Sequence, residues 1–302
     1  MTRTLPAAGV ARSGGMTRRL HTLWPLDLAR TLAIHRRGRA DPAYRIRSDG
    51  SIWRAVHTPD GAGTIAVSRD GDTVSARAWG PGAQWLLESM PALIGAHDDP
   101  GGLVPRDRIV ASLVARATGV RIGRSDRVWE ALAPAVLEQK VLGAEAWRAW
   151  RHLLMRFGEV APGAPDMRVP PEQRRWREIP SWEWHRSGAE PVRMRTIWGA
   201  TAMNVEKHHD HLTLLRGVGP WTEAETRARA VGDVDAVPVG DYHIPSMVGT
   251  TLIGEPVDDD GMLELLEPYA GQRYRVIRLI ILGGARSPRR GPRLAMRDYR
   301  SF

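Results

Sequence analysis

The stretch that most constrains the fold is RGVGPWTEAE, residues 216–225, because it joins two helix-like segments through a turn of a few residues. The preceding KHHDHLTLLR is polar with helical spacing, and Pro220 suits the first position of a second helix. Gly217 and Gly219 allow backbone conformations that other residues resist. The pattern predicts a helix, a glycine turn and a second helix whose main-chain amides face outward toward a phosphate.

That phosphate can belong to a nucleotide or to a nucleic-acid backbone. A dinucleotide site needs a third glycine and a preceding strand, whereas Thr222 holds that place and a helix-like segment precedes it. A P-loop lysine is also absent, so the turn favours a DNA backbone phosphate. The net charge of +9 and the pI of about 10.7 agree with a polyanionic partner, although an arginine-rich composition from a GC-rich genome explains them equally well.

Composition excludes several other classes of protein. The chain has no cysteine, which excludes disulfides, thiol catalysis and iron–sulfur clusters. It has no 18-residue apolar run, so no membrane-spanning helix is expected. The opening MTRTLPAAGVARSGGMTRRL lacks the apolar centre of a secretory signal. We therefore expect a soluble cytoplasmic protein.

The hydrophobic period changes once along the chain. Between residues 44 and 80, short runs are separated by SDG, PDG and RDGD, which predicts three or four antiparallel strands. From residue 106 onward the apolar spacing is helical. The predicted fold class is α+β, with a small N-terminal antiparallel-sheet domain followed by an all-α module. The predicted divisions are a flexible lead (1–18), the α+β domain (19–105), the helical domain (106–285) and a basic tail (286–302).

The glycine turn and a second segment together resemble a known family, the helix-hairpin-helix (HhH-GPD) DNA glycosylases. The family hairpin reads L-x-G-[VI]-G-x-W-T, and residues 215–222 read LRGVGPWT. The family's catalytic aspartate follows in a [FV]-P-x-[GD]-D-Y segment, and VPVGDY (237–242) places Asp241 at the family's distance from Gly219. Over roughly residues 20–285 the chain looks most similar to the AlkA-type 3-methyladenine DNA glycosylases (type II), in their actinobacterial form.

The resemblance implies roles for Asp241 and Trp221. Asp241 would stabilise the positive charge that builds on the sugar and would orient water. Because it precedes the helix-like YHIPSMVGTTL, helix capping alone would also explain it. Trp221 stands where bifunctional relatives carry a Schiff-base lysine, so no AP lyase activity is expected. Its indole would line the base pocket and attract a cationic alkylated base; packing inside the hairpin is the alternative.

The resemblance assigns the remaining site residues in the same way. Glu225 and Gln139 would line the base pocket, with Glu225 in a place where relatives can carry an aromatic residue. Ile122, in GVRIGRSD (119–126), matches the wedge that fills the gap left by a flipped base, although core packing is the common role of an isoleucine. The assigned DNA-backbone contacts are Gly217, Gly219 and Thr222. Hairpin carbonyls of relatives bind a monovalent Na or K ion, and here these are Thr213, Leu215 and Val218.

The function implied by the resemblance is a monofunctional glycosylase for alkylated purines, 3-methyladenine first. It would flip the damaged nucleotide out of double-stranded DNA and hydrolyse its N-glycosidic bond in base excision repair. It would work as a nucleoid-associated monomer without an organic cofactor and without a membrane. The alternatives are a monofunctional glycosylase for hypoxanthine or an oxidised base, and a non-catalytic helix-hairpin-helix DNA-binding protein.

Overall fold

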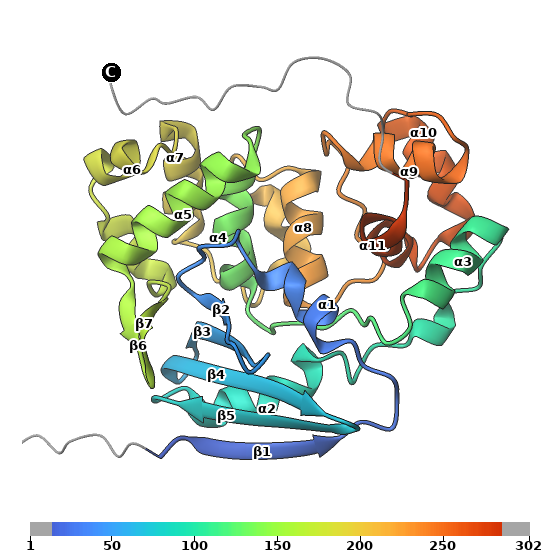
Figure 1. The fold of residues 1–302 in the computed structure, drawn as a ribbon. Coiled ribbons are helices and arrows are strands. Elements are labelled where there is room, and N and C mark those ends of the chain that lie inside the picture. The colour runs from blue at the N-terminus through green and yellow to red at the C-terminus, as the bar shows by residue number, and fades with distance from the viewer. Residues whose placement is uncertain (1–13, 286–302) are drawn as a thin grey trace, which may run out of the picture.

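A five-stranded antiparallel sheet lies at one end of the molecule, and the helices stack on it (Figure 1). The computed structural model describes residues 14–285. The strand order is β1-β5-β4-β3-β2. The strands are β1 (Met16–His21), β2 (Tyr44–Ile46), β3 (Ile52–Thr58), β4 (Gly61–Asp70) and β5 (Thr73–Trp79). The predicted α+β class is confirmed, and the segment between residues 44 and 80, where three or four strands are expected, contains the four strands β2–β5.

The first strand was not part of the predicted sheet. β1 pairs with β5 along its whole length, from Met16 opposite Ala78 to His21 opposite Thr73. The last three residues of the predicted flexible lead are therefore strand residues at an edge of the sheet. Residues 1–13 of that lead and the predicted basic tail (286–302) lie outside the described residues.

The helices after residue 106 form two groups on either side of helix α8 (Pro220–Ala230) (Figure 1). Within residues 14–285, none of them is long and apolar enough to cross a membrane. The α-helices are α1 (Leu28–Leu32), α2 (Ala83–Leu93), α3 (Arg108–Arg116), α4 (Val128–Glu138), α5 (Gly143–Phe157), α6 (Ser181–Ser187), α7 (Pro191–Ala200), α8 (Pro220–Ala230), α9 (Ile244–Leu252), α10 (Asp259–Leu266) and α11 (Arg273–Gly283). Short 3-10 helices are η1 (Ala33–His35), η2 (Pro100–Gly102), η3 (Gln173–Glu178), η4 (His209–Leu214) and η5 (Glu267–Tyr269).

The sequence predicts only helices after residue 106, but this region also contains two strands. Strands β6 (Glu159–Ala161) and β7 (Ala164–Val169) form a small antiparallel hairpin. Gly163 turns it with a φ of 72°, a left-handed conformation that glycine adopts without steric cost. The buried residues Ala161, Ala164 and Met167 pack with Ala55 of β3. The hairpin therefore covers part of the sheet.

Three large apolar clusters hold the fold together. One joins the sheet to α1 and α2 around residues such as Leu32, Ile65 and Met90. A second joins α4–α7 to the glycine turn, with Leu212 and Val218 among its buried members. A third joins α3 to α9–α11. We keep the predicted boundary at residue 105 as a proposal, since α3 begins at Arg108 and packs with the helices that end the described chain.

Candidate active site

The glycine turn is built as the sequence predicts, with one difference in its first half. The segment before the turn is the 3-10 helix η4, kinked at His211, rather than a regular α-helix. Leu212 and Val218 are buried and anchor the two sides of the turn in the core. The Val218 amide donates to the Leu215 carbonyl at 2.9 Å, which closes the turn. Pro220 occupies the first turn of α8, as expected.

The two turn glycines serve different purposes. Gly217 has a φ of 89°, and a Cβ there would lie 2.2 Å from the Thr196 hydroxyl oxygen on α7. Gly219 has an ordinary φ of −105° and open space around it. Among the described residues neither glycine amide has a hydrogen-bond acceptor. These amides and the N-terminus of α8 therefore offer free donors and a positive dipole end to an anion.

The structure brings Asp241 and Trp221 together beside this turn. The indole Nε1 of Trp221 donates to Asp241 Oδ2 at 2.8 Å. The other oxygen, Oδ1, accepts the amides of His243 at 2.8 Å and Ile244 at 2.9 Å, at the start of α9. Asp241 thus binds the first amides of α9 from two residues before the N-cap, His243, and it is half-buried with its second oxygen bound to the tryptophan. Three hydrogen bonds hold one carboxylate in a single orientation.

Gln139 ties the turn between α4 and α5 to the glycine turn rather than facing free space. Its side-chain amide donates to the Gly217 carbonyl at 2.8 Å and to the Thr222 hydroxyl at 2.9 Å. The Gln139 carbonyl in turn accepts two bonds from the buried guanidinium of Arg193. Thr222 is itself buried, so any contact it makes with DNA comes from its main chain.

Gln139 begins a short turn that separates two helices. Helix α4 ends at Glu138, and α5 begins at Gly143. Lys140 lies between them with a φ of 51°, one of two non-glycine residues with positive φ within residues 14–285. Its side chain is exposed, and its neighbour Gln139 bonds to the glycine turn. The signal available in the sequence was the pair of short helical stripes separated by QKVLG.

Glu225, one turn beyond Trp221 on α8, is an ion-paired residue. Its carboxylate is 2.5 Å from Arg229 Nη1, and both side chains are nearly buried. Burial alone would lower the pKa of Arg229, but the neighbouring Glu225 carboxylate outweighs it and the pKa is raised. Burial also raises the pKa of Tyr274 and lowers that of Arg278, two α11 residues near the pair. Glu225 therefore brings a charged pair to the position on α8 where the resemblance allows an aromatic side chain.

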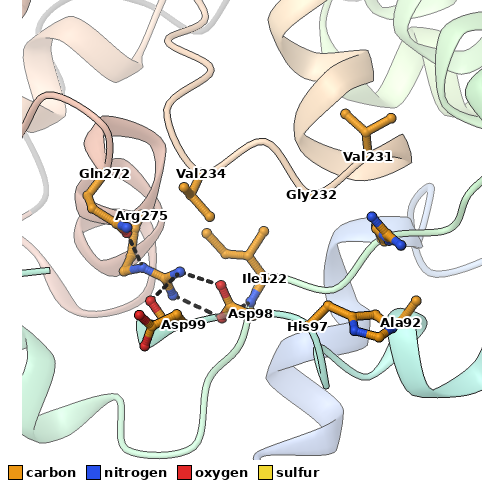
Figure 2. Close-up of a pocket in the computed structure, with 11 residues that line it drawn as sticks. Ala92, His97, Asp98, Asp99, Ile122, Val231, Gly232, Val234, Gln272 and Arg275 are labelled. Atoms are coloured by element: carbon orange, nitrogen blue, oxygen red, sulfur yellow. Dashed lines mark hydrogen bonds and ion pairs between the residues drawn. The ribbon is translucent and has the colours of Figure 1, made fainter. Parts of the chain in front are cut away.

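Ile122 does not have the exposure that a wedge requires. Only 6 % of it is exposed, and it packs against Ala224 and Ala228 of α8 and Tyr274 of α11. Figure 2 shows it pointing toward Val234 in the wall of a cavity of about 230 Å³. That cavity lies at the C-terminal end of α8, about 15 Å along the helix from Trp221 at the usual rise per residue. Burial between two helices argues against the wedge assignment, and Ile122 is a core residue.

The predicted cation site at the hairpin carbonyls remains a prediction. The Leu215 carbonyl already accepts the Val218 amide and keeps one further lone pair. The carbonyls of Thr213 and Val218 belong to the same turn. A Na or K ion held there would stiffen the turn and add positive charge next to the free amides.

Solved structures of DNA glycosylases share this fold. The 3-methyladenine DNA glycosylase from Archaeoglobus fulgidus superposes with a TM-score of 0.74 at 16 % identity, covering 87 % of this chain and 97 % of that chain. MBOgg1 in complex with a low affinity DNA ligand superposes with a TM-score of 0.72 at 15 % identity, covering 88 % and 94 %. The apo-form of the Clostridium acetobutylicum 8-oxoguanine glycosylase/lyase gives 0.68 at 12 % identity, covering 88 % and 95 %. No family model matches the chain, and no curated protein matches its sequence.

Proposed function

We propose that this chain is a monofunctional DNA glycosylase of the helix-hairpin-helix superfamily, AlkA-like, that excises alkylated purines from double-stranded DNA. The observation that carries the proposal is the Trp221–Asp241 hydrogen bond of 2.8 Å beside a glycine turn with free amides. It sets an oriented carboxylate next to a site for one backbone phosphate. The shared fold with a 3-methyladenine glycosylase supports the same reading. The enzyme would act as a cytoplasmic monomer in base excision repair.

Asp241 would act on the sugar of the flipped nucleotide. Breaking the N-glycosidic bond builds positive charge on that sugar, and a fixed carboxylate stabilises it without reorganising during the reaction. The same carboxylate can orient the attacking water. The two amide bonds to Oδ1 and the indole bond to Oδ2 hold the carboxylate in place. A capped helix end thus supplies the preorganisation.

The glycine turn would hold one phosphate of the DNA backbone. The Gly217 and Gly219 amides and the start of α8 provide donors without a charged side chain. Lys140, the neighbour of Gln139 in the chain, would add a cation if its exposed side chain reaches the same phosphate. Binding should therefore weaken steeply as salt is raised.

Trp221 supports base removal without strand cleavage. An indole cannot form the Schiff base that a lyase needs, and its N–H is already bound to Asp241. The chain has only two lysines, Lys140 and Lys207. The indole face would attract an electron-poor alkylated base by about 0.5–2 kcal/mol.

The Glu225–Arg229 pair favours a second candidate, a monofunctional glycosylase for an oxidised or deaminated base. A charged wall one turn beyond Trp221 offers hydrogen bonds to a neutral base, which a purely aromatic pocket does not. Solved neighbours of similar TM-score include an 8-oxoguanine glycosylase/lyase as well as a 3-methyladenine glycosylase. The two candidates share Asp241 and differ only in the lesion.

The test is a base-release assay on duplexes that carry 3-methyladenine, hypoxanthine or 8-oxoguanine, with wild type, Asp241→Asn and Asp258→Asn. Asp258 caps α10 through Gly261 and serves as a matched capping aspartate away from the turn. We expect release by wild type and Asp258→Asn, and at least about a hundredfold slower release by Asp241→Asn. Strands should break only after alkali treatment. Equal release by all three proteins removes Asp241 from the mechanism, and binding without release by wild type indicates a non-catalytic DNA-binding protein.

A further inference from the structure

A small cavity lies between the sheet and helix α4, away from the glycine turn. Its volume is about 20 Å³. Three of the residues that line it carry buried polar atoms with no hydrogen-bond partner among the described residues: His35 Nε2, Tyr44 Oη and Glu130 Oε2. Buried polar groups in folded proteins are nearly always hydrogen-bonded to protein or to ordered water. Three buried polar atoms without partners around one cavity therefore indicate that the cavity holds a hydrogen-bonding molecule or ion.

The bound species must accept a hydrogen bond from one group and donate a hydrogen bond to another. The Tyr44 hydroxyl needs an acceptor, and the Glu130 carboxylate oxygen needs a donor. Burial and the arginines around it, Arg54 first, hold the pKa of His35 well below its usual value, so the ring is neutral and its Nε2 either donates or accepts. An anion would be repelled by Glu130, and a cation would be repelled by the Arg37 and Arg54 guanidiniums in the same wall.

We propose that an ordered water molecule fills this cavity and bridges Tyr44, Glu130 and His35. The volume suits one water, since roughly 10–15 Å³ is the least that holds one. Water donates and accepts twice, and about three hydrogen bonds are typical of a buried water. His35 and Tyr44 belong to η1 and β2, while Glu130 belongs to α4. The water thus links the sheet end of the molecule to the helix that carries Gln139 at its C-terminal end.

The direct ion pair beside the cavity does not replace this bridge. Arg54 of β3 donates to the other Glu130 oxygen, Oε1, which leaves Oε2 without a partner. Asp41, also in the wall, is already bound by the amides of Arg37 and Ala43 and by the Trp150 indole. The neighbouring groups are therefore satisfied by the protein, and the three orphans are what the water would serve.

The test combines a crystal structure of the whole chain, at a resolution that shows ordered water, with thermal unfolding of Tyr44→Phe. We expect density within hydrogen-bond distance of Tyr44 Oη and Glu130 Oε2. We also expect Tyr44→Phe to lower Tm by about 2 °C, because the bridge loses a partner. Tyr242→Phe, at an 81 % exposed tyrosine, is the matched control and should leave Tm unchanged.

If the cavity holds no water, Tyr44→Phe should not lower Tm. Removing an orphaned buried hydroxyl then leaves Tm unchanged or raises it. Such a Tm, an empty cavity in the density, or direct contacts that pair the three groups with one another would each overturn the proposal.

Discussion

Helix α8 has two ends with different surroundings. At its N-terminal end the Gly217 and Gly219 amides have no acceptor, and Trp221 faces Asp241. At its C-terminal end the Arg229 and Ala230 carbonyls accept the amides of Ser125 and Asp126, each at 2.9 Å. Arg229 also reaches the Ile34 carbonyl in η1 at 3.0 Å. One helix thus leaves donors free at one end and satisfies its acceptors at the other.

We propose that the N-terminal end of α8 binds a ligand, whereas its C-terminal end anchors the helix. The last carbonyls of a helix need partners, and here the loop before α4 supplies them. The first amides need partners as well, and those of Gly217 and Gly219 have none among the described residues. We propose that the sheet end fixes the direction of α8 and that the opposite end binds an anion. Substitutions at the two ends should therefore change different measurements.

The largest expected effect is on stability, at the closed end. Arg229→Met leaves the nearly buried Glu225 carboxylate without its partner and removes the bond to Ile34. We expect the free energy of unfolding to fall by about 2–3 kcal/mol, less than for a fully buried pair. Urea denaturation measures it, with Arg108→Met at an exposed position on α3 as the control. Affinity for undamaged DNA, which presents no flipped lesion, should change by less than about twofold; a large loss of that affinity would mean that the two ends are not separate.

The next effect is at the open end and changes both stability and binding. Gly217→Ala places a Cβ at positive φ and 2.2 Å from the Thr196 hydroxyl, which should cost about 2 kcal/mol. Gly219→Ala has open space and negative φ, so it should cost less than about 1 kcal/mol. Denaturation and DNA titration at fixed salt test both variants. If Gly219→Ala weakened folding as much as Gly217→Ala, the strain assigned to Gly217 would be wrong.

The sequence predicted the open end of α8 better than the closed one. The glycine turn and the strands between residues 44 and 80 depend on local turn chemistry, which short motifs record. The partners of Gln139, by contrast, lie 78 and 83 residues away, and no motif records them. Strand β1 was missed for the same reason. It lies at the edge of the sheet, and its single neighbour, β5, is distant in the sequence.

Ile122 shows why a loop position alone does not identify a functional side chain. It follows a glycine-containing loop, as a wedge would, yet helices α8 and α11 close over it. Glu225 is the reverse case. It stands in the predicted pocket wall, and its pairing with Arg229 at i, i+4 on the same helix was readable from spacing alone. Tertiary packing determines the role of Ile122, whereas helical periodicity determines the partner of Glu225.

A smaller effect is expected on chemistry at the open end. Trp221→Phe keeps an aromatic ring but removes the N–H that binds Asp241 Oδ2. We expect single-turnover base release to slow by about tenfold, the value of one hydrogen bond to a charged group. DNA affinity should stay close to wild type. An unchanged rate would show that the indole bond does not position the carboxylate.

The smallest expected effect is on the pH dependence of stability, at a residue away from both ends of α8. Glu183 on α6 has its pKa lowered below 4.5, first by the His152 hydrogen bond and then by Arg156. A lowered folded pKa means that this stabilisation is present above pH 4.5 and is lost as pH falls through the folded value. Unfolding between pH 6 and 3 should therefore be less pH-dependent for Glu183→Gln than for wild type. Glu178→Gln, at a surface pair, should follow the wild-type curve.

The most direct test of the central claim measures affinity and rate for Asp241→Asn on one duplex. The claim is that the open end of α8 holds the DNA while the Asp241 carboxylate does the chemistry. We predict a dissociation constant within about threefold of wild type and single-turnover base release at least about a hundredfold slower. A variant that binds as wild type does and also releases the base at the wild-type rate would contradict the claim.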